Sequence, residues 1–338
     1  MKIKSLLLGS AAAMLAVSGA SAADKVSQVV IPEPEVVEYV RVCDAYGTGY
    51  FYIPGTETCL RVHGYVRFDV GFGELQGNEV DGGTTYDVRS RGNVRVSTAR
   101  ETDLGTLRTT ARFHVQNDDG ESFVGFDKAY LDLGGLRIGS TDSLFTTFTG
   151  YAGAVINDGA YGPFNTNLIS YTYSGGAFSL AASVEQTSAD ELYDYLPHIV
   201  IGAGYDAGVV NIRGVAGYDA TNEAWAGKVR VDADVTDAVS AFIMAMYGQA
   251  SSGFATWTEG GNWSVIGGAS FDVSDDTSVN AQVQWFQNRG YGSDPWTIVA
   301  NVNHNLTDGM IVRPEVLWAR DSSGEWAWGG KVRFQVNY

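Results

Sequence analysis

The chain has 338 residues and a formal net charge of −17, from 22 Lys and Arg against 39 Asp and Glu. It holds 42 Gly, 18 Tyr, 15 Phe and 8 Trp, a composition that favours short strands and turns over helices. The acidic surplus argues against a nucleic-acid partner, because such proteins need positive charge to displace phosphate counterions.

Residues 1–22 have the pattern of a secretory signal peptide. Two lysines precede an apolar run at 6–17, and an Ala-Ser-Ala cleavage site follows at 20–22. The run is shorter than the roughly 18 residues that a spanning helix needs. We therefore predict an exported protein that starts at Ala23, with a mature net charge of 20 − 39 = −19 once both signal lysines are removed.

Residues 23–59 form a separate N-terminal segment in this prediction. Its first part is acidic, contains two prolines and has no clear period, which is typical of an extended linker. Cys43 and Cys59 are the two cysteines of the chain, and in an oxidising compartment such a pair usually forms a disulfide. A metal site is disfavoured, because no histidine is adjacent to either cysteine.

From Leu60 onward, stretches of alternating polar and apolar residues are separated in turn by short polar turns and by longer loops. A period of two indicates a strand whose two faces meet different surroundings. The pattern predicts sixteen strands, at 60–71, 88–100, 105–117, 123–133, 136–142, 167–174, 177–186, 197–206, 209–219, 224–235, 239–250, 262–273, 277–288, 295–306, 310–321 and 325–338.

An even number of strands, with tight turns at one end and long loops at the other, is typical of a transmembrane barrel. A closed barrel satisfies every backbone hydrogen bond in hydrocarbon without leaving an edge. We therefore predict an all-β fold, a sixteen-stranded antiparallel transmembrane β-barrel over 60–338 with an inward-folded constriction loop. A soluble sandwich or propeller is disfavoured, because the polar faces repeatedly carry arginine rather than surface Lys and Glu.

The last strand, KVRFQVNY, shows what the two faces meet. Lys331, Arg333 and their alternate neighbours fall on one side, and the apolar residues up to Tyr338 on the other. Lipid is the expected partner of the apolar side, with Tyr338 in the interfacial aromatic girdle. The polar side is expected to line the lumen.

The same alternation places a set of basic residues on the inner face of the first five strands and the last strand. Their clustering on neighbouring strands predicts a strongly positive stretch of lumen wall, here called the basic arc. It consists of Arg61, Arg67, Arg91, Arg95, Arg108, Arg112, Lys128, Arg137, Lys331 and Arg333.

The longest connection, SLFTTFTGYAGAVINDGAYGPFNT at 143–166, lies in a stretch with no Lys or Arg between Arg137 and Arg213. Loops of this length are usually functional. Folded into the barrel, this constriction loop would hold Asp158, with Asp142 just before it, across from the basic arc. Opposite charges on facing walls create a transverse field that orders permeating solutes. A solid, plugged lumen is disfavoured, because sixteen strands enclose more space than side chains fill.

Enzymatic chemistry has little support in the sequence. The four histidines, His63, His114, His198 and His304, are scattered, and neither a G-x-S-x-G elbow nor an H-E-x-x-H pair occurs. We predict a non-enzyme without a cofactor or metal, although a catalytic site assembled across strands remains an alternative.

The block VEYVRVCDAYGTGYFYIPGTETCLRVHGYVRFDV at 37–70, the alanine-rich signal and the terminal KVRFQVNY resemble the general porins of alphaproteobacteria, most closely the Brucella-type major outer-membrane porins. The resemblance implies a homotrimer in the Gram-negative outer membrane, beside lipid and lipopolysaccharide. It also implies insertion by the barrel assembly machinery through Tyr338, and attachment to peptidoglycan through Ala23-Asp24.

We therefore expect a water-filled channel for passive diffusion of small hydrophilic solutes and ions. Acidic loops at the mouths favour a mild cation preference, which the basic arc opposes. Two alternatives stay open: a sugar-type channel with an aromatic path along Phe145, Phe148, Tyr151, Tyr161 and Phe164, and a plugged barrel with an enzymatic or structural role.

Overall fold

The computed structural model describes residues 41–75, 79–80, 83–84, 86–187, 196–257, 262–288, 290 and 292–338. The predicted signal peptide at 1–22, the linker at 23–40 and the Ala23-Asp24 start lie outside the described residues. Among the described residues, no helix is long and apolar enough to cross a membrane.

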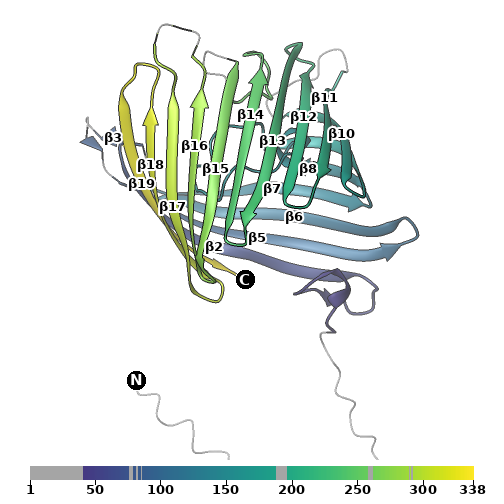
Figure 1. Cartoon of the computed structure of the whole chain (residues 1–338). Helices are drawn as coiled ribbons and strands as arrows, with labels where there is room; N and C mark the ends of the chain where they lie inside the picture. The colour runs from purple at the N-terminus through teal and green to yellow at the C-terminus, as the bar shows by residue number, and fades with distance from the viewer. Residues whose placement is uncertain are drawn as a thin grey trace, which may run out of the picture. The chain divides into compact units, whose positions relative to one another are not determined.

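The fold is an antiparallel sheet that closes on itself (Figure 1). Seventeen strands belong to this sheet; one of them, β1, is a two-residue strand outside the ring, so sixteen described strands form the barrel. They are β2 (Cys59–Gly73), β5 (Tyr86–Thr102), β6 (Gly105–Asp118), β7 (Glu121–Leu133), β8 (Leu136–Thr141), β9 (Thr166–Gly175), β10 (Phe178–Thr187), β11 (His198–Asp206), β12 (Val210–Asp219), β13 (Ala224–Thr236), β14 (Val239–Gly248), β15 (Trp263–Ser274), β16 (Thr277–Phe286), β17 (Trp296–Thr307), β18 (Met310–Arg320) and β19 (Trp326–Asn337).

Five small elements complete the described fold. They are the 3₁₀ turn η1 (Asp44–Tyr46) with β1 (Phe51–Tyr52), the strand pair β3 (Glu79–Val80) and β4 (Gly83–Thr84), and the helical turn α1 (Leu144–Thr147). None of these was predicted, because each is shorter than a pattern of period two or 3.6 can reveal.

The barrel closes between its last and first strands. β19 pairs with β2 in a continuous register from Gly329 opposite Gly73 to Asn337 opposite Tyr65. Beyond that register, Tyr338 and Gly64 exchange two backbone hydrogen bonds of 2.9 and 3.1 Å. Gly64 also leaves room for the Tyr338 hydroxyl, which lies 3.0 Å from the position that a Cβ would take. The chain end is therefore part of the seam.

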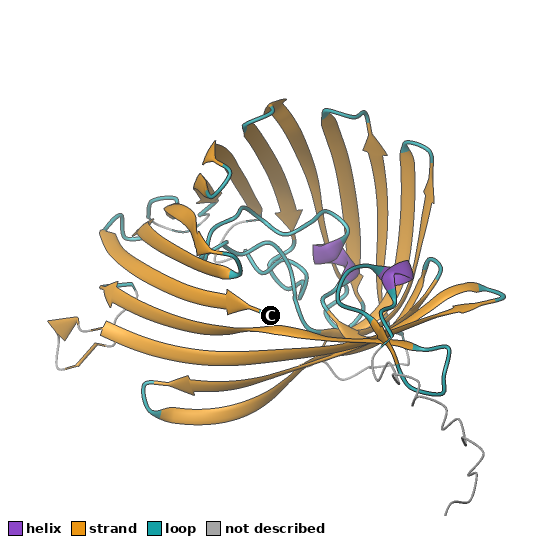
Figure 2. Ribbon diagram, turned by 90° about the horizontal axis from the view of Figure 1, so that it is seen from below, coloured by secondary structure: helices purple, strands orange, loops and turns teal. Residues whose placement is uncertain are grey.

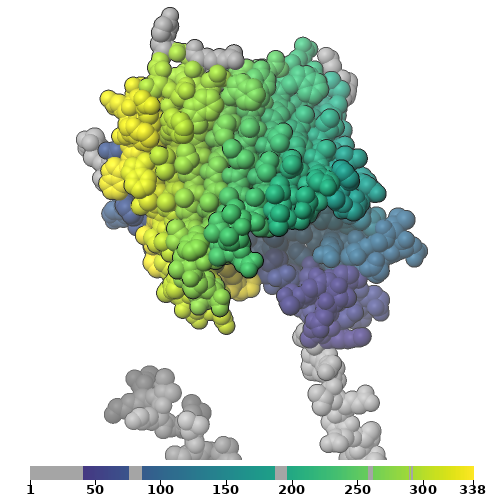
Figure 3. Space-filling view, viewed as in Figure 1, coloured from purple at the N-terminus to yellow at the C-terminus, as the bar shows by residue number. Residues whose placement is uncertain are grey.

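The alternation predicted from the sequence is present along the strands. On β2, Val66 is 60% exposed on the outer face, whereas Asp69 is fully buried on the inner face. The outer side chains of the strands form a continuous wall in the space-filling view (Figure 3). Among the described residues no element covers this apolar outer surface, which fits burial in lipid.

The predicted turns are confirmed, with one difference between β6 and β7. A five-residue connection was expected there, but the strands extend to Asp118 and Glu121 and leave a two-residue turn. Asp119 and Gly120 have φ values of 48° and 94°. Positive φ at both positions is the requirement of a type I′ turn, which Asp-Gly favours.

The described part of the N-terminal segment, residues 41–58, packs at the short-turn end of the barrel. Cys43 and Cys59 form the predicted disulfide. Both are buried in a small cluster with Tyr50 and with Ala99 of β5. The disulfide thus fastens this segment to the beginning of β2.

Replacing both cysteines by serine is expected to loosen residues 44–58 without opening the barrel. A disulfide that closes a loop of about 15 residues contributes roughly 3 kcal/mol by restricting the unfolded chain. The barrel strands keep their own hydrogen bonds. Limited proteolysis should therefore cut the variant in this segment faster than the oxidised wild type, at unchanged channel conductance. Equal cutting rates would contradict this assignment.

Candidate functional site

The constriction loop lies inside the ring of strands (Figure 2). It begins at the buried Ser143, whose hydroxyl donates to Glu185 of β10 at 2.5 Å. The backbone N–H of Leu144 donates to the same carboxylate at 2.9 Å. Ser143 also caps α1 by accepting from the N–H of Phe145. Glu185, on the inner face of β10, therefore fixes the start of the loop.

The loop then crosses to the opposite wall. The N–H of Gly153 donates to Gln282 of β16 at 2.7 Å, and the N–H of Ala160 donates to Gln284 at 3.0 Å. The tip of the loop rests on Glu315 of β18, which accepts from the N–H of Ile156 and, at 2.9 Å, from that of Asn157. Backbone donors thus hold the loop along the inner wall.

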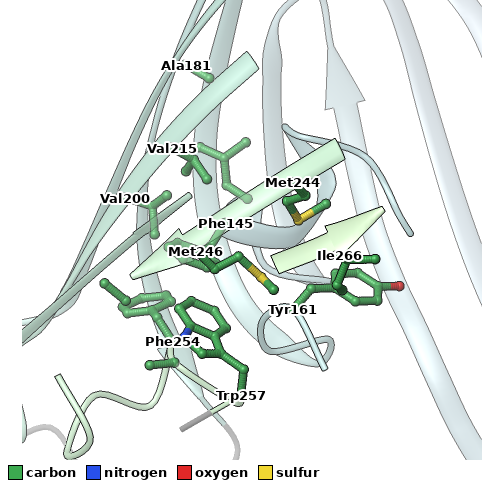
Figure 4. Packing of buried hydrophobic residues seen from close by; sticks show 13 residues of the cluster. Phe145, Tyr161, Ala181, Val200, Val215, Met244, Met246, Phe254, Trp257 and Ile266 are labelled. Atoms are coloured by element: carbon green, nitrogen blue, oxygen red, sulfur yellow. The ribbon is translucent and has the colours of Figure 1, made fainter. Parts of the chain in front are cut away.

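An apolar cluster explains where the loop settles (Figure 4). The loop contributes Leu144, Phe145 and Tyr161, and the connection after β14 contributes Phe254 and Trp257. They cover apolar side chains on the inner face of β10 to β15, namely Ala181, Val200, Val215, Ala226, Met244, Met246 and Ile266. The inner face is thus not polar throughout, because this part of it packs against loops rather than water.

Lys228 lies within this cluster. Its Nζ donates to the backbone carbonyl of Tyr161 at 2.6 Å and lies 4.8 Å from the ring centroid of Phe145. Its neighbour on the inner face, Arg230, binds the carboxylate of Asp232 at 2.6 Å and donates to the carbonyl of Tyr151. Both basic residues therefore hold the loop.

Across the lumen from the loop, most of the basic arc lies midway along β2, β5, β6, β7 and β19. Asp69 on β2 is its centre. The buried carboxylate accepts from Arg333 at 2.7 and 2.9 Å and from Arg89 at 2.7 Å. Arg67 donates to Gln335 at 2.8 Å, and Arg91 donates to Gln116 at 2.5 Å.

A β-bulge adds a carboxylate that the sequence alternation misses. The register between β6 and β7 shifts between Arg112 and Phe113, which turns Asp127 inward beside Lys128. Asp127 pairs with Arg112 at 2.9 Å, with His114 at 2.5 Å and with Asn93 at 3.1 Å. Bulges re-aim single side chains in this way.

Asp142 joins the basic arc to the loop. Its carboxylate binds Lys128 and, at 2.5 Å, the hydroxyl of Tyr151. Asp158, the second predicted acid, instead accepts from Tyr161 at 2.5 Å. Burial raises the pKa of Asp158, and the hydrogen bond from Tyr161 partly offsets this. Among the described residues, the two predicted acids thus differ: Asp142 contacts the arc and Asp158 has no ion pair with it.

The remaining residues of the basic arc lie at two levels along the barrel axis. Arg95 lies opposite both His63 and Arg112, and Lys331 lies opposite Gly71 and Glu315, all on the middle of the wall. Three others lie near the short-turn end: Arg61 over Tyr50, Arg108 over Tyr46 and Arg137 paired with Asp132.

The basic arc and the acids predicted from alternation do not include Lys228, Arg230, Asp127 or Glu315. Lys228 and Arg230 alternate with the valines at 229 and 231, so the two-residue period could have placed them inside. Glu315 lies between Pro314 and Val316 and two residues after Arg313, so the same period also places it on the inner face. The alternation could not predict the bulge at Asp127, because a bulge is an interruption of that alternation.

The aromatic path considered for sugars is only partly available. Phe145 and Tyr161 are fully buried in the apolar cluster. Tyr151 and Phe164 are exposed, and their rings stack at 6.2 Å with an interplanar angle of 12°.

Comparison with known proteins agrees with this architecture. The porin subfamily matches residues 27–336. The porin Omp2b of Brucella neotomae is 44% identical over 379 aligned residues that cover 100% of both chains, and that of Brucella suis is 43% identical with the same coverage. A triple mutant of Rhodopseudomonas blastica porin shares the fold, with a TM-score of 0.60 at 16% identity over 82% of this chain and 100% of the other. The closed barrel and its full-length porin relatives indicate an outer-membrane channel of a Gram-negative cell rather than an enzyme, and the chain belongs to the porin subfamily.

Proposed function

We propose that the chain is a passive diffusion channel whose narrowest point lies between the basic arc and the constriction loop. One observation carries this assignment: the loop is fastened to the inner wall from β10 to β18, and Asp142, just before the loop, binds Lys128 of the arc. The path for solutes then runs beside the half-buried arginines of β2 and β5. Small hydrophilic solutes and ions cross without chemical change or energy input.

The charges on the two sides of this path differ. The arc presents guanidinium groups, whereas the loop side presents Asp142 and backbone carbonyls, and its own cations, Lys228 and Arg230, are engaged by the loop. Such an arrangement produces a transverse field in the constriction. Acidic loops favour cations at the mouths, and the arc favours anions in the narrow part.

Planar-bilayer recording under a salt gradient tests the proposal. Large ohmic steps would support an open channel, and the reversal potential gives the sign of its selectivity. A folded, heat-modifiable barrel without conductance would overturn the proposal and favour a plugged barrel with an enzymatic or structural role.

A sugar-type channel is the second candidate, favoured by the exposed, stacked pair of Tyr151 and Phe164. Stacking on aromatic faces would slow a sugar inside the channel. Saturable inhibition of ion conductance by neutral oligosaccharides would support this candidate, and a purely viscosity-dependent effect would exclude it.

The proposed partners follow from the same function. A homotrimer should give conductance steps that appear or close in threes. Lipid and lipopolysaccharide surround the apolar wall, and Tyr338 at the seam is the proposed signal for the barrel assembly machinery.

Attachment to peptidoglycan through Ala23-Asp24 would leave muropeptides on the mature N-terminus. Detection of free Ala23 alone would contradict peptidoglycan as a partner.

Replacing Arg67 and Arg112 by alanine is expected to widen the constriction and to shift selectivity toward cations. The change removes two positive charges and releases Asp127 from its arginine. The cation-to-anion permeability ratio should rise on the order of several-fold, because a charged lumen concentrates counterions. The Arg61→Ala, Arg108→Ala variant removes equal charge near the short-turn end and should shift the ratio less. An unchanged reversal potential in the first variant would contradict the placement of the constriction.

A further inference from the structure

Two arginines of the basic arc and two glutamines lie in one row of inward-facing side chains across four neighbouring strands. Gln335 of β19 is opposite Arg67 of β2, Arg67 is opposite Arg91 of β5, and Arg91 is opposite Gln116 of β6. We call this the Gln–Arg–Arg–Gln row. Like charges directly opposite each other on a sheet are destabilising, so the two central arginines need a compensating group.

The two glutamines orient the guanidinium groups. Nε of Arg67 donates to Gln335 at 2.8 Å, and Nε of Arg91 donates to Gln116 at 2.5 Å. The Arg67 guanidinium also lies 4.4 Å from the ring centroid of Tyr65. In each arginine, Nε is engaged and the terminal Nη groups make no hydrogen bond to a described residue. Both side chains are half-buried, so these groups remain accessible from the lumen.

The glutamines are themselves held. Nε2 of Gln335 donates to Asn337 at 2.7 Å, and Nε2 of Gln116 donates to Asp118 at 3.0 Å. Each amide therefore presents its oxygen to the arginine. The row is a pre-oriented pair of donors rather than two mobile charges, and pre-orientation lowers the cost of binding.

The adjacent row shows what two arginines do when the chain supplies an anion. There, Arg333, Asp69 and Arg89 are opposite one another on the same three strands, β19, β2 and β5. The buried Asp69 carboxylate accepts from both arginines at 2.7 to 2.9 Å. The Asp69 carboxylate is thus already bound by Arg333 and Arg89 and does not compensate Arg67 or Arg91. Among the described residues, none places a carboxylate within salt-bridge distance of Arg67 or Arg91.

We propose that the Gln–Arg–Arg–Gln row binds an oxyanion of the phosphate class, through the Nη groups of Arg67 and Arg91. Two guanidinium groups match the geometry of a phosphate or phosphomonoester, and charge-assisted hydrogen bonds of this kind are the strong ones. The bound phosphate compensates the two arginines of this row, as the Asp69 carboxylate compensates Arg333 and Arg89 in the adjacent row. The site lies on the proposed solute path, so it acts as a station for phosphorylated solutes, and it rests on the proposed channel function.

Titration of inorganic phosphate into a bilayer recording tests the site. The channel is first recorded in KCl, and phosphate is then added at constant ionic strength. The wild type is expected to show a saturable loss of conductance. In the Arg67→Gln, Arg91→Gln variant, the phosphate concentration for half the effect should rise at least about tenfold, the factor for losing one charged hydrogen bond.

Two further variants separate the site from the general field of the arc. Arg313 lies on β18, where its Nε donates to Asn303 at 3.1 Å, and Arg95 lies on β5 opposite His63, so both are outside the row. Arg95→Gln, Arg313→Gln removes the same charge and should keep a phosphate response close to that of the wild type. Arg67→Lys, Arg91→Lys keeps the charge but loses the planar fork, and should weaken phosphate binding with little change in reversal potential. Equal weakening in both glutamine variants would overturn the site, as would a wild type without saturation. Conductance in KCl alone reports the channel function independently.

Discussion

Replacing Glu315 by alanine is expected to release the tip of the constriction loop and to raise single-channel conductance. Glu315 is 2% exposed and accepts hydrogen bonds from Ile156, from both the backbone and side chain of Asn157 and from Asn301. Hydrogen bonds to a charged acceptor contribute about 1.5–3 kcal/mol each, so losing the three from the tip weakens its attachment by at least about 4.5 kcal/mol. The freed tip should spend part of the time nearer the mouth, away from the constriction, which leaves the narrow part of the channel wider.

The expected record therefore has a higher mean conductance and more current noise than that of the wild type. Glu315→Gln, which keeps the shape and loses the charge, should lie between the two. Glu325→Ala is the matched control, because it removes one carboxylate from the exposed connection between β18 and β19 without touching the loop. If Glu315→Ala and Glu325→Ala gave the same conductance and noise, the anchoring role of Glu315 would be wrong.

The loop and its wall also show how far the sequence predicts this structure. Strand positions followed from alternation alone, because one face of each strand meets lipid and must be apolar. Val66 and Asp69 on β2 are examples: their side chains face outward and inward as the period of two requires. Closure into a barrel followed from the same pattern, since no other element was available to cover the apolar face.

Where the inner face packs against protein, the alternation of polar and apolar residues no longer distinguishes the inner face from the outer face. Met244 and Met246 face inward although they are apolar, because Phe145 and Trp257 cover them from loops distant in sequence. The same packing holds the tip of the loop along the wall, where Asp158 bonds to Tyr161. No local rule contains these contacts, which depend on where a long loop comes to rest.

The bulge at Asp127 is a different limit. One extra residue puts the side chains on its two sides out of phase, so residues 121–126 of β7 do not continue the alternation that begins at Lys128. Phe123 accordingly contacts the His114 ring in the interior, at 5.3 Å between centroids. Lys128 therefore has its predicted inner position, whereas the side chains between the Asp119-Gly120 turn and Asp127 face the opposite way from a continued alternation.

The seam of the barrel gives the prediction with the largest effect on stability. Asp69→Ala is expected to lower the free energy of unfolding by about 3–5 kcal/mol, the usual cost of removing one member of a buried ion pair. Asp69 is fully buried on β2 and connects Arg333 on β19, the last strand, to Arg89 on β5. Its loss leaves two guanidinium groups facing each other where the barrel closes.

The temperature at which the folded form converts to the unfolded form in gel electrophoresis measures this loss, together with unfolding in urea. Asp132→Ala is the matched control. It removes an aspartate from the pair with Arg137, whose side chains are 25% and 37% exposed, and such pairs contribute at most about 1 kcal/mol. Equal losses of unfolding free energy in the two variants would show that the buried Asp69 pairs contribute no more to stability than an exposed pair.

Formate distinguishes the two possible causes of a loss in Asp69→Ala. If the loss arises from facing guanidinium groups, a small carboxylate that enters the vacated space should restore part of the stability, whereas chloride at equal ionic strength should restore less. If the loss arises from the missing side-chain volume, both salts should act alike. The first outcome would also explain how the neighbouring Gln–Arg–Arg–Gln row is tolerated. Its arginines donate to glutamines, and Arg67 also contacts an aromatic ring. In the proposed site, their accessible Nη groups then bind an anion from solution in place of the carboxylate that the chain does not supply.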